Sequence, residues 1–185
     1  MKGSIICCLA ELVQQRFGEE QWRAIREDVG AGNPPGMRLA TADLDDAIAL
    51  KLLDSTCAIL KLSLQQVADA FGEHWCCHYA PRVYMSYVRR FKNAREMTLG
   101  MDSVHVDVTQ NIPNARPPRF AYHWQDEHTL LVTYRSERQL IDLYVGLARG
   151  VGTYFKEKIA VQRISDSQCR IRFSSLPPAA PPASA

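Results

Sequence analysis

The spacing of apolar residues changes near Pro113 in this 185-residue chain, and that change limits the fold that the chain can form. Before Pro113 apolar residues recur every three or four positions, as in Ile5, Leu9 and Val13, which predicts amphipathic helices. After the pair Pro117 and Pro118 they alternate, which predicts short strands. We therefore expect an α+β fold, in which an N-terminal helical half packs on a C-terminal half with a small antiparallel sheet and a long helix.

The expected elements follow from this periodicity and from local cap signals. The expected helices cover residues 4–17, 19–28, 41–60, 63–81, 83–91, 94–112 and 139–155, and the expected strands cover 120–123, 128–134, 158–164 and 168–173. Thr41 is the expected N-cap of the third helix, Ser63 and Gln66 form a capping box for the fourth, and Pro81 is expected to end it. Residues 177–185 contain only Pro, Ala and Ser and are expected to be disordered, so one domain spans 1–176.

Composition excludes several classes of partner. The 22 basic and 20 acidic residues are spread along the chain, so no charged block favours nucleic acid or a membrane surface. The six cysteines include the vicinal pairs Cys7-Cys8 and Cys76-Cys77, which is not the spacing of a disulfide framework. No segment approaches the roughly 20 apolar residues of a transmembrane helix. We expect a soluble, cytoplasmic protein.

Tyr134, Ser136 and Arg138 form the strongest candidate binding motif. They follow the apolar strand 129–133 at alternate positions, so their side chains are expected on one side if the strand persists. All three donate hydrogen bonds, and Arg138 adds a charge and a bidentate fork, a combination that suits a carboxylate or a phosphate. The simpler alternative is a strand end, with Ser136 capping the next helix and Arg138 in water.

His105 lies on an apolar helix face, four residues after Met101 and three before Val108. Taken alone, such a histidine is more often a core residue with one hydrogen bond. A neutral imidazole is also a common iron ligand, and an anion-binding motif would hold the acidic groups at the edge of a haem. His105 and the motif at 134–138 together indicate a buried cofactor that carries a metal and carboxylates.

With their order and spacing, these residues resemble the H-NOX family of haem domains, which is similar to the sensor region of soluble guanylate cyclase. The resemblance rests on segments spread over nearly the whole chain: Met1-Lys2-Gly3, Phe71-Gly72-Glu73, Val104-His105-Val106, Ala115-Arg116-Pro117-Pro118-Arg119, Tyr134-x-Ser136-x-Arg138 and Gly146-Leu147. It implies haem b buried between the two halves, with His105 as the proximal iron ligand. It also implies that Tyr134, Ser136 and Arg138 bind the propionates, that Pro118 distorts the haem, and that Met101 and Ile5 contact it.

The resemblance also implies which gas is bound. Family members that hold oxygen have a tyrosine five residues after the arginine of the motif, and here that position is Leu143. The expected distal pocket contains Ile5, Leu9, Trp75, Leu143 and Leu147, and its apolar character favours nitric oxide, with carbon monoxide as a second candidate gas. Tyr144 is turned about 100° away on the same helix.

The function implied is that of a bacterial, non-enzymatic gas sensor that signals through release of His105. A histidine kinase or a cyclic-dinucleotide enzyme is the implied partner. Two alternatives stay open: an oxygen-binding or haem-carrying protein of the same fold, and a haem-free module that binds an anionic metabolite through Tyr134, Ser136 and Arg138. A metal site at His74 and His78 is a further alternative, although it lacks additional ligands at a matching spacing.

Overall fold

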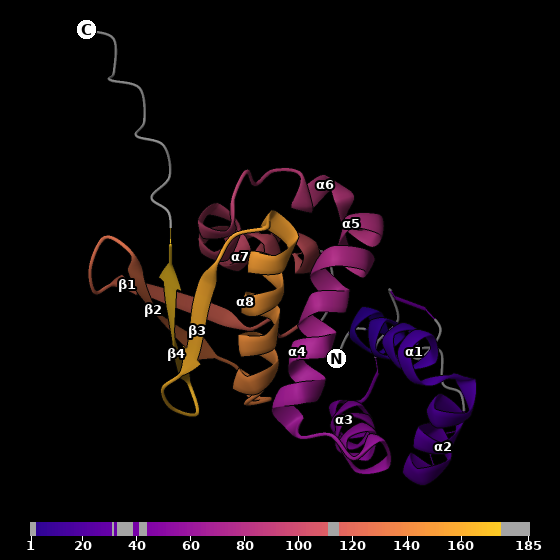
Figure 1. The fold of residues 1–185 in the computed structure, drawn as a ribbon. Helices are drawn as coiled ribbons and strands as arrows, with labels where there is room; N and C mark the ends of the chain where they lie inside the picture. Colours follow the sequence, from indigo (N-terminus) through magenta and orange to yellow (C-terminus); the bar gives the residue numbers. More distant parts are fainter. Residues whose placement is uncertain (1–2, 31, 33–38, 41–43, 111–114, 175–185) are drawn as a thin grey trace, which may run out of the picture.

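The computed structural model describes residues 3–30, 32, 39–40, 44–110 and 115–174. Figure 1 shows these residues as successive layers: a sheet, then helix α8, then helix α4, and on the far side the helices α1, α2 and α3. This is the expected α+β arrangement, with a helical half and a half built on an antiparallel sheet. The predicted cap at Thr41, the turn residue Pro113 and the tail 177–185 lie outside the described residues.

The N-terminal helices α1 (Gly3–Phe17), α2 (Glu19–Val29) and α3 (Asp46–Leu60) form an apolar core to which Phe71, Tyr79 and Leu143 from later helices also contribute. The prediction that the third helix begins near residue 41 was wrong. Asp45 is its N-cap, because the Asp45 carboxylate accepts a hydrogen bond of 2.7 Å from the Ala47 amide. The N-cap therefore lies four residues after the predicted one.

Helix α4 (Leu64–His74) begins with the predicted capping box of Ser63 and Gln66. The prediction that Pro81 ends this helix was wrong. A π-helical turn, Trp75–Tyr79, follows α4, and α5 (Ala80–Val83) then continues it. The Ala80 amide bonds to the Trp75 carbonyl, so Pro81 falls in the first turn of α5, where a missing N–H costs no helical hydrogen bond.

The helix that carries His105 is α7 (Ala94–Thr109), which begins at an Asn93 cap and ends three residues before the predicted limit. Between α5 and α7, only α6 (Met85–Val88) is helical where a longer segment was expected. Val88, the last residue of α6, is buried in the hydrophobic core that also contains residues of the sheet and of α8.

The sheet contains β1 (Arg119–Trp124), β2 (Thr129–Arg135), β3 (Ile159–Arg163) and β4 (Gln168–Phe173) in the order β1-β2-β4-β3, all antiparallel. Helix α8 (Ile141–Phe155) covers one face, onto which Leu130, Val132 and Ile171 project and are fully buried. The alternate residues of each strand point to the opposite face. The two predicted hairpins therefore join through β2 and β4.

Helices α4 and α8 meet backbone to backbone at three glycines. A Cβ atom added at Gly146 would lie 2.0 Å from the Ala68 carbonyl oxygen, and one at Gly72 would lie 2.0 Å from the Gly146 carbonyl oxygen. A Cβ atom at Gly150 would lie 2.1 Å from the Gly72 oxygen. No side chain can be accommodated at these positions unless the two helices separate, because protein interiors are close-packed.

Gly146→Ala is expected to lower the free energy of unfolding by about 3 kcal/mol, since the added methyl group meets rigid backbone. Gly152→Ala in the same helix is the matched control, because the added Cβ atom would lie 2.6 Å from a side-chain atom of Ile159 and 3.1 Å from the Glu157 carbonyl oxygen, so its closest neighbour is a side chain and not backbone. The helix propensity of alanine offsets that contact, so this control should stay within about 1 kcal/mol of the wild type. Urea denaturation measures both values. Equal stability of the two variants would contradict the tight crossing.

Candidate functional site

The His105 side chain is mostly buried on α7 and has a defined tautomer. Its Nδ1 atom lies 2.8 Å from the Met101 carbonyl oxygen, and a carbonyl only accepts, so Nδ1 carries the proton. Burial lowers the pKa of His105 below its usual value, which favours the neutral ring. The Nε2 atom is then left with a lone pair, as a metal ligand requires. The Phe120 ring lies beside the imidazole, with 5.5 Å between the centroids.

Asp102 joins the His105 helix to the first strand. Its carboxylate accepts two hydrogen bonds from Arg119, at 2.9 and 2.6 Å, and a third from the Phe120 amide at 2.9 Å. One turn earlier, the Tyr122 hydroxyl donates to the Thr98 carbonyl at 2.8 Å. Helix α7 and strand β1 are therefore fixed to each other on the N-terminal side of His105, and a displacement of the helix would move the start of the strand.

Tyr134 and Ser136 lie close together although the strand does not persist between them. Strand β2 ends at Arg135, and residues 137 and 138 form a turn that brings the Ser136 hydroxyl to 3.3 Å from the Arg138 amide. Tyr134 is buried, which raises the pKa of its phenol, and Ser136 lies within hydrogen-bonding reach of it. The three predicted residues thus come from one strand end and one turn.

Arg138 holds a carboxylate in this structure. Its Nε atom donates to Asp46 at 2.7 Å, and its Nη1 atom donates to the Arg116 carbonyl at 2.8 Å. Asp46 lies in the first turn of α3 and is 92 residues away in sequence. Pro117 and Pro118 follow Arg116 in the loop before β1 and are half-buried. The loop of Pro118, the motif and the N-terminus of α3 therefore meet at the Arg138 guanidinium.

An apolar pocket lies between α1, α3, α4 and α8. Every residue that lines it is apolar: Ile5, Ile6, Leu9, Ala49, Leu50, Leu53, Phe71, Leu140 and Leu143. Trp75 and Leu147 pack beside this core, and the Trp75 ring stacks on Phe71 with 5.8 Å between centroids. Of the five residues expected in a distal pocket, the structure brings three to its wall and two next to it.

Leu143 and Tyr144 are adjacent in α8 but pack in different hydrophobic cores. Leu143 lines the apolar pocket, whereas the Tyr144 ring packs against Phe120 and stacks on Tyr134, at centroid distances of 4.9 and 5.8 Å. Burial raises the pKa of Tyr144 well above its usual value, so the phenol stays protonated. Consecutive residues of a helix point about 100° apart, so Leu143 and Tyr144 face different sides of α8, as predicted.

His74 has a partner other than a metal. It is 2% exposed, and its Nε2 atom lies 3.2 Å from a Glu11 carboxylate oxygen, while Arg82 binds the second oxygen of Glu11. His78 stacks obliquely on His74, with 5.3 Å between centroids. The described part of the chain contains no group of three or more His, Cys, Asp or Glu residues placed to hold a metal ion. The cluster ties α1 to the helix that carries Phe71 and Trp75.

Three residues of this region were missed by sequence reasoning. Phe120 contacts the rings of His105, Tyr134 and Tyr144, and its position in an alternating strand predicted burial but not this neighbourhood. Asp102 was not among the predicted site residues, although its spacing one turn before His105 was the available signal. Asp46 was not predicted either, and no local pattern indicates its pairing with Arg138.

The donor set fits a haem. A neutral, mostly buried imidazole with a free Nε2 lone pair suits iron, and the hydroxyls of Tyr134 and Ser136 with the Arg138 guanidinium suit carboxylates. Arg138 already binds one carboxylate, that of Asp46, through a hydrogen bond of 2.7 Å from its Nε atom. Phe120 connects the two groups, because its ring lies close to those of both His105 and Tyr134.

A family model described as haem-NO-binding matches residues 2–163, which is most of the chain. The chain therefore belongs to the haem-NO-binding family. No curated protein sequence gives a significant match. The family assignment agrees with the resemblance drawn from the motifs.

Solved structures show the same fold. A mutant H-NOX protein of T. tengcongensis matches with a TM-score of 0.78 and 20% identity, over 95% of this chain and 99% of its own. The Fe(II) unliganded H-NOX protein from K. algicida gives 0.76 and 21%, over 95% and 97%. An oxygen-binding H-NOX domain related to soluble guanylate cyclases, in its oxygen complex, gives 0.76 and 21%, over 95% and 96%. The chain thus has the fold of haem-binding gas sensors, and no helix among its described residues could span a membrane.

The buried His74 predicts a pH dependence of stability. Burial lowers the pKa of His74 in the folded chain, so below about pH 6.5 the unfolded chain binds a proton that the folded chain resists. The stability supplied by neutral His74 is therefore complete above that pH and is lost as the pH falls. His74→Gln should flatten the decline in unfolding free energy between about pH 7.5 and about pH 5.5. The difference in unfolding free energy between the variant and the wild type at about pH 8 measures the effect of the substitution that does not depend on protonation. An unchanged dependence of unfolding free energy on pH would contradict the role of His74.

Proposed function

We propose that this protein is a cytoplasmic gas sensor that binds nitric oxide at a ferrous haem b and signals to a separate protein through release of His105. The observation that carries the proposal is the pairing of His105, with its free Nε2 lone pair, and the carboxylate-binding group formed by Tyr134, Ser136 and Arg138. Membership of the haem-NO-binding family supports it. A histidine kinase or a cyclic-dinucleotide enzyme is the partner that we propose.

Different side chains would contact the propionates, the ring and the iron of the haem. When bound, a ferrous haem would supply an iron able to bind a diatomic gas, and His105 would be its protein ligand. Tyr134, Ser136 and Arg138 would donate hydrogen bonds to the propionates, which cost several kcal/mol to bury without donors. Pro118 in its half-buried loop and Met101 one turn before His105 would contact the ring, as would Ile5 at the pocket wall.

The pocket composition supports selectivity for nitric oxide over oxygen. Bound oxygen is stabilised by a hydrogen-bond donor, and none of the side chains that line the pocket can donate. Carbon monoxide, which also gains little from a donor, is a second candidate gas. The Tyr144 hydroxyl belongs to the other core, where its ring stacks on Phe120 and Tyr134.

The path of the signal begins at α7. His105 is bonded through Nδ1 to its own helix, so a force on the ring acts directly on the backbone near Met101. Asp102, in the same turn, holds Arg119 and the Phe120 amide of β1. Release of His105 would let α7 shift, and the Asp102 contacts would carry that shift to the sheet.

An absorption spectrum tests the proposal. Protein expressed with ample haem should show a Soret band, and His105→Ala should lose or strongly shift it. Nitric oxide should change the spectrum of the reduced protein, whereas air should give no long-lived oxygen-bound form. A chain without a Soret band would instead favour the module that binds an anionic metabolite, and stable oxygen binding would favour the oxygen carrier.

Leu143→Tyr should convert the weak and short-lived oxygen binding expected of the wild type into more stable binding. The new hydroxyl would enter the apolar pocket as its donor and should slow oxygen release by about tenfold or more, consistent with one added hydrogen bond of about 1.4 kcal/mol. Tyr144→Phe is the matched control, because it removes a hydroxyl from the neighbouring position outside the pocket. Stopped-flow measurement of oxygen release checks both variants. Oxygen binding that depends on Tyr144 and not on position 143 would contradict the assignment.

A further inference from the structure

One face of the sheet has a uniform chemical character. Because α8 covers the face of Leu130 and Ile171, the alternate residues of each strand form an outward face (Figure 1). All of them except Thr129 are half-buried or exposed. The outward face carries four arginines, Arg119, Arg135, Arg170 and Arg172, and one histidine, His123, and no acidic residue of the four strands.

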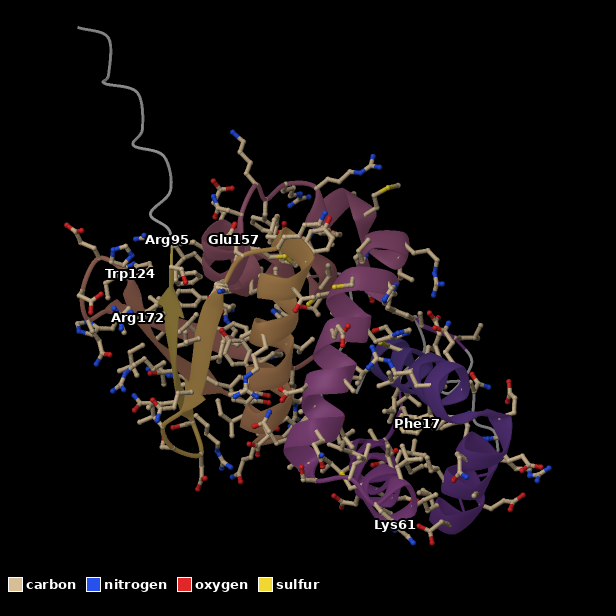
Figure 2. All side chains as sticks on the ribbon, viewed as in Figure 1. Phe17, Lys61, Arg95, Trp124, Glu157 and Arg172 are labelled. Atoms are coloured by element: carbon tan, nitrogen blue, oxygen red, sulfur yellow. The ribbon has the colours of Figure 1, made fainter. Side chains whose placement is uncertain are left out.

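The strand register brings these arginines together. Arg119 lies opposite Arg135 on β1 and β2, while Arg170 pairs with Leu131 and Arg172 with Thr129 on β4 and β2. Figure 2 shows Arg172 on the side of the sheet that faces away from α8. The face thus concentrates charge that the chain as a whole lacks, since the net charge of all 185 residues is only +2.

The arginines of this face are only partly neutralised by the chain itself. Arg119 pairs with Asp102, and Arg170 donates to the neutral Gln125 side chain at 3.0 Å. Among the described residues, no carboxylate lies within salt-bridge distance of Arg135, Arg170 or Arg172, although the charge of Arg172 contributes to lowering the pKa of the nearby Asp126. Such guanidinium groups on a broad antiparallel face are suited to bidentate pairing with carboxylates.

We infer that the outward face of the sheet is the docking surface for an acidic segment of the signalling partner. This inference rests on the proposed function, because it names the surface through which the gas signal leaves the sensor. Half-buried Leu131, between His123 and Arg170 in the register, gives the centre of the face an apolar contact, and arginine is enriched in protein interfaces. The aromatic residues of the sheet, Phe120, Tyr122, Trp124, Tyr134 and Phe173, all project to the other face, so the surface lacks stacking platforms for single-stranded nucleic acid.

The face is linked directly to His105. Arg119 belongs to the face and is held by Asp102, which lies one turn before His105 on α7. The Asp102 carboxylate stays ionised because, although partial burial opposes it, hydrogen bonds from Arg119 and the Phe120 amide lower its pKa. A movement of α7 would therefore shift Arg119 and the edge of the face that Arg119 and Arg135 form.

The test measures binding of a blocked peptide of about ten alternating Glu and Ala residues to the full-length haem protein, with a Gln and Ala peptide for comparison. The triple variant Arg135→Glu, Arg170→Glu, Arg172→Glu should lower the affinity for the Glu peptide by about tenfold or more. The matched control is Lys51→Glu, Lys61→Glu, Arg89→Glu, which changes the net charge equally at exposed positions outside the sheet. If the first variant misfolds, the corresponding Gln substitutions should still weaken binding. Equal loss in the control would overturn the proposal.

Two further arms distinguish other occupants and the gas response. Phosphatidylserine vesicles or a single-stranded oligonucleotide that bind these arginines more tightly than the peptide would overturn the proposal in favour of a membrane or a nucleic acid. The peptide affinity should differ by about fivefold or more between the reduced protein with and without nitric oxide, and equal affinities would overturn the output role. Failure of the proposed function is a separate result, since the Soret band and its response to nitric oxide are recorded on the same samples.

Discussion

The contact between α4 and α8 is the constraint on which the rest of the structure depends. Three glycines let the two backbones touch, so α8 can face the sheet on one side and α4 on the other. That crossing separates two cores. The pocket with Leu143 lies in one, and the aromatic group of Phe120, Tyr134 and Tyr144 lies in the other. A looser crossing would merge these cores and remove the distinction between adjacent side chains of α8.

A second set of contacts connects this frame to the candidate ligand. His105 is bonded to the backbone of α7, and Asp102 bonds that helix to β1 through three hydrogen bonds. The same strand has Phe120 facing His105 and Arg119 facing outward. Strand β1 therefore has the candidate haem site on one face and the proposed partner surface on the other. A gas signal would need to pass only from His105 through Asp102 to Arg119.

The sequence was informative where local chemistry decides the structure. The capping box of Ser63 and Gln66, the alternation in β2 and the helical step between Leu143 and Tyr144 are all set by neighbours in sequence, and the structure has them as predicted. Pro81 misled because a π-helical turn, which tertiary packing sustains, moves it into a new first turn. The contact of Asp46 with Arg138 and the joining of two hairpins through β2 and β4 depend on long-range packing that no local pattern contains.

The central claim is that His105 leaves the iron when nitric oxide binds. Electron paramagnetic resonance of the reduced protein, saturated with nitric oxide, tests it directly, because a histidine that stays bound adds hyperfine coupling from its own nitrogen. The account predicts coupling from the nitrogen of nitric oxide alone. Coupling from a second nitrogen in the fully occupied protein would contradict it, since α7 would then remain tethered through His105.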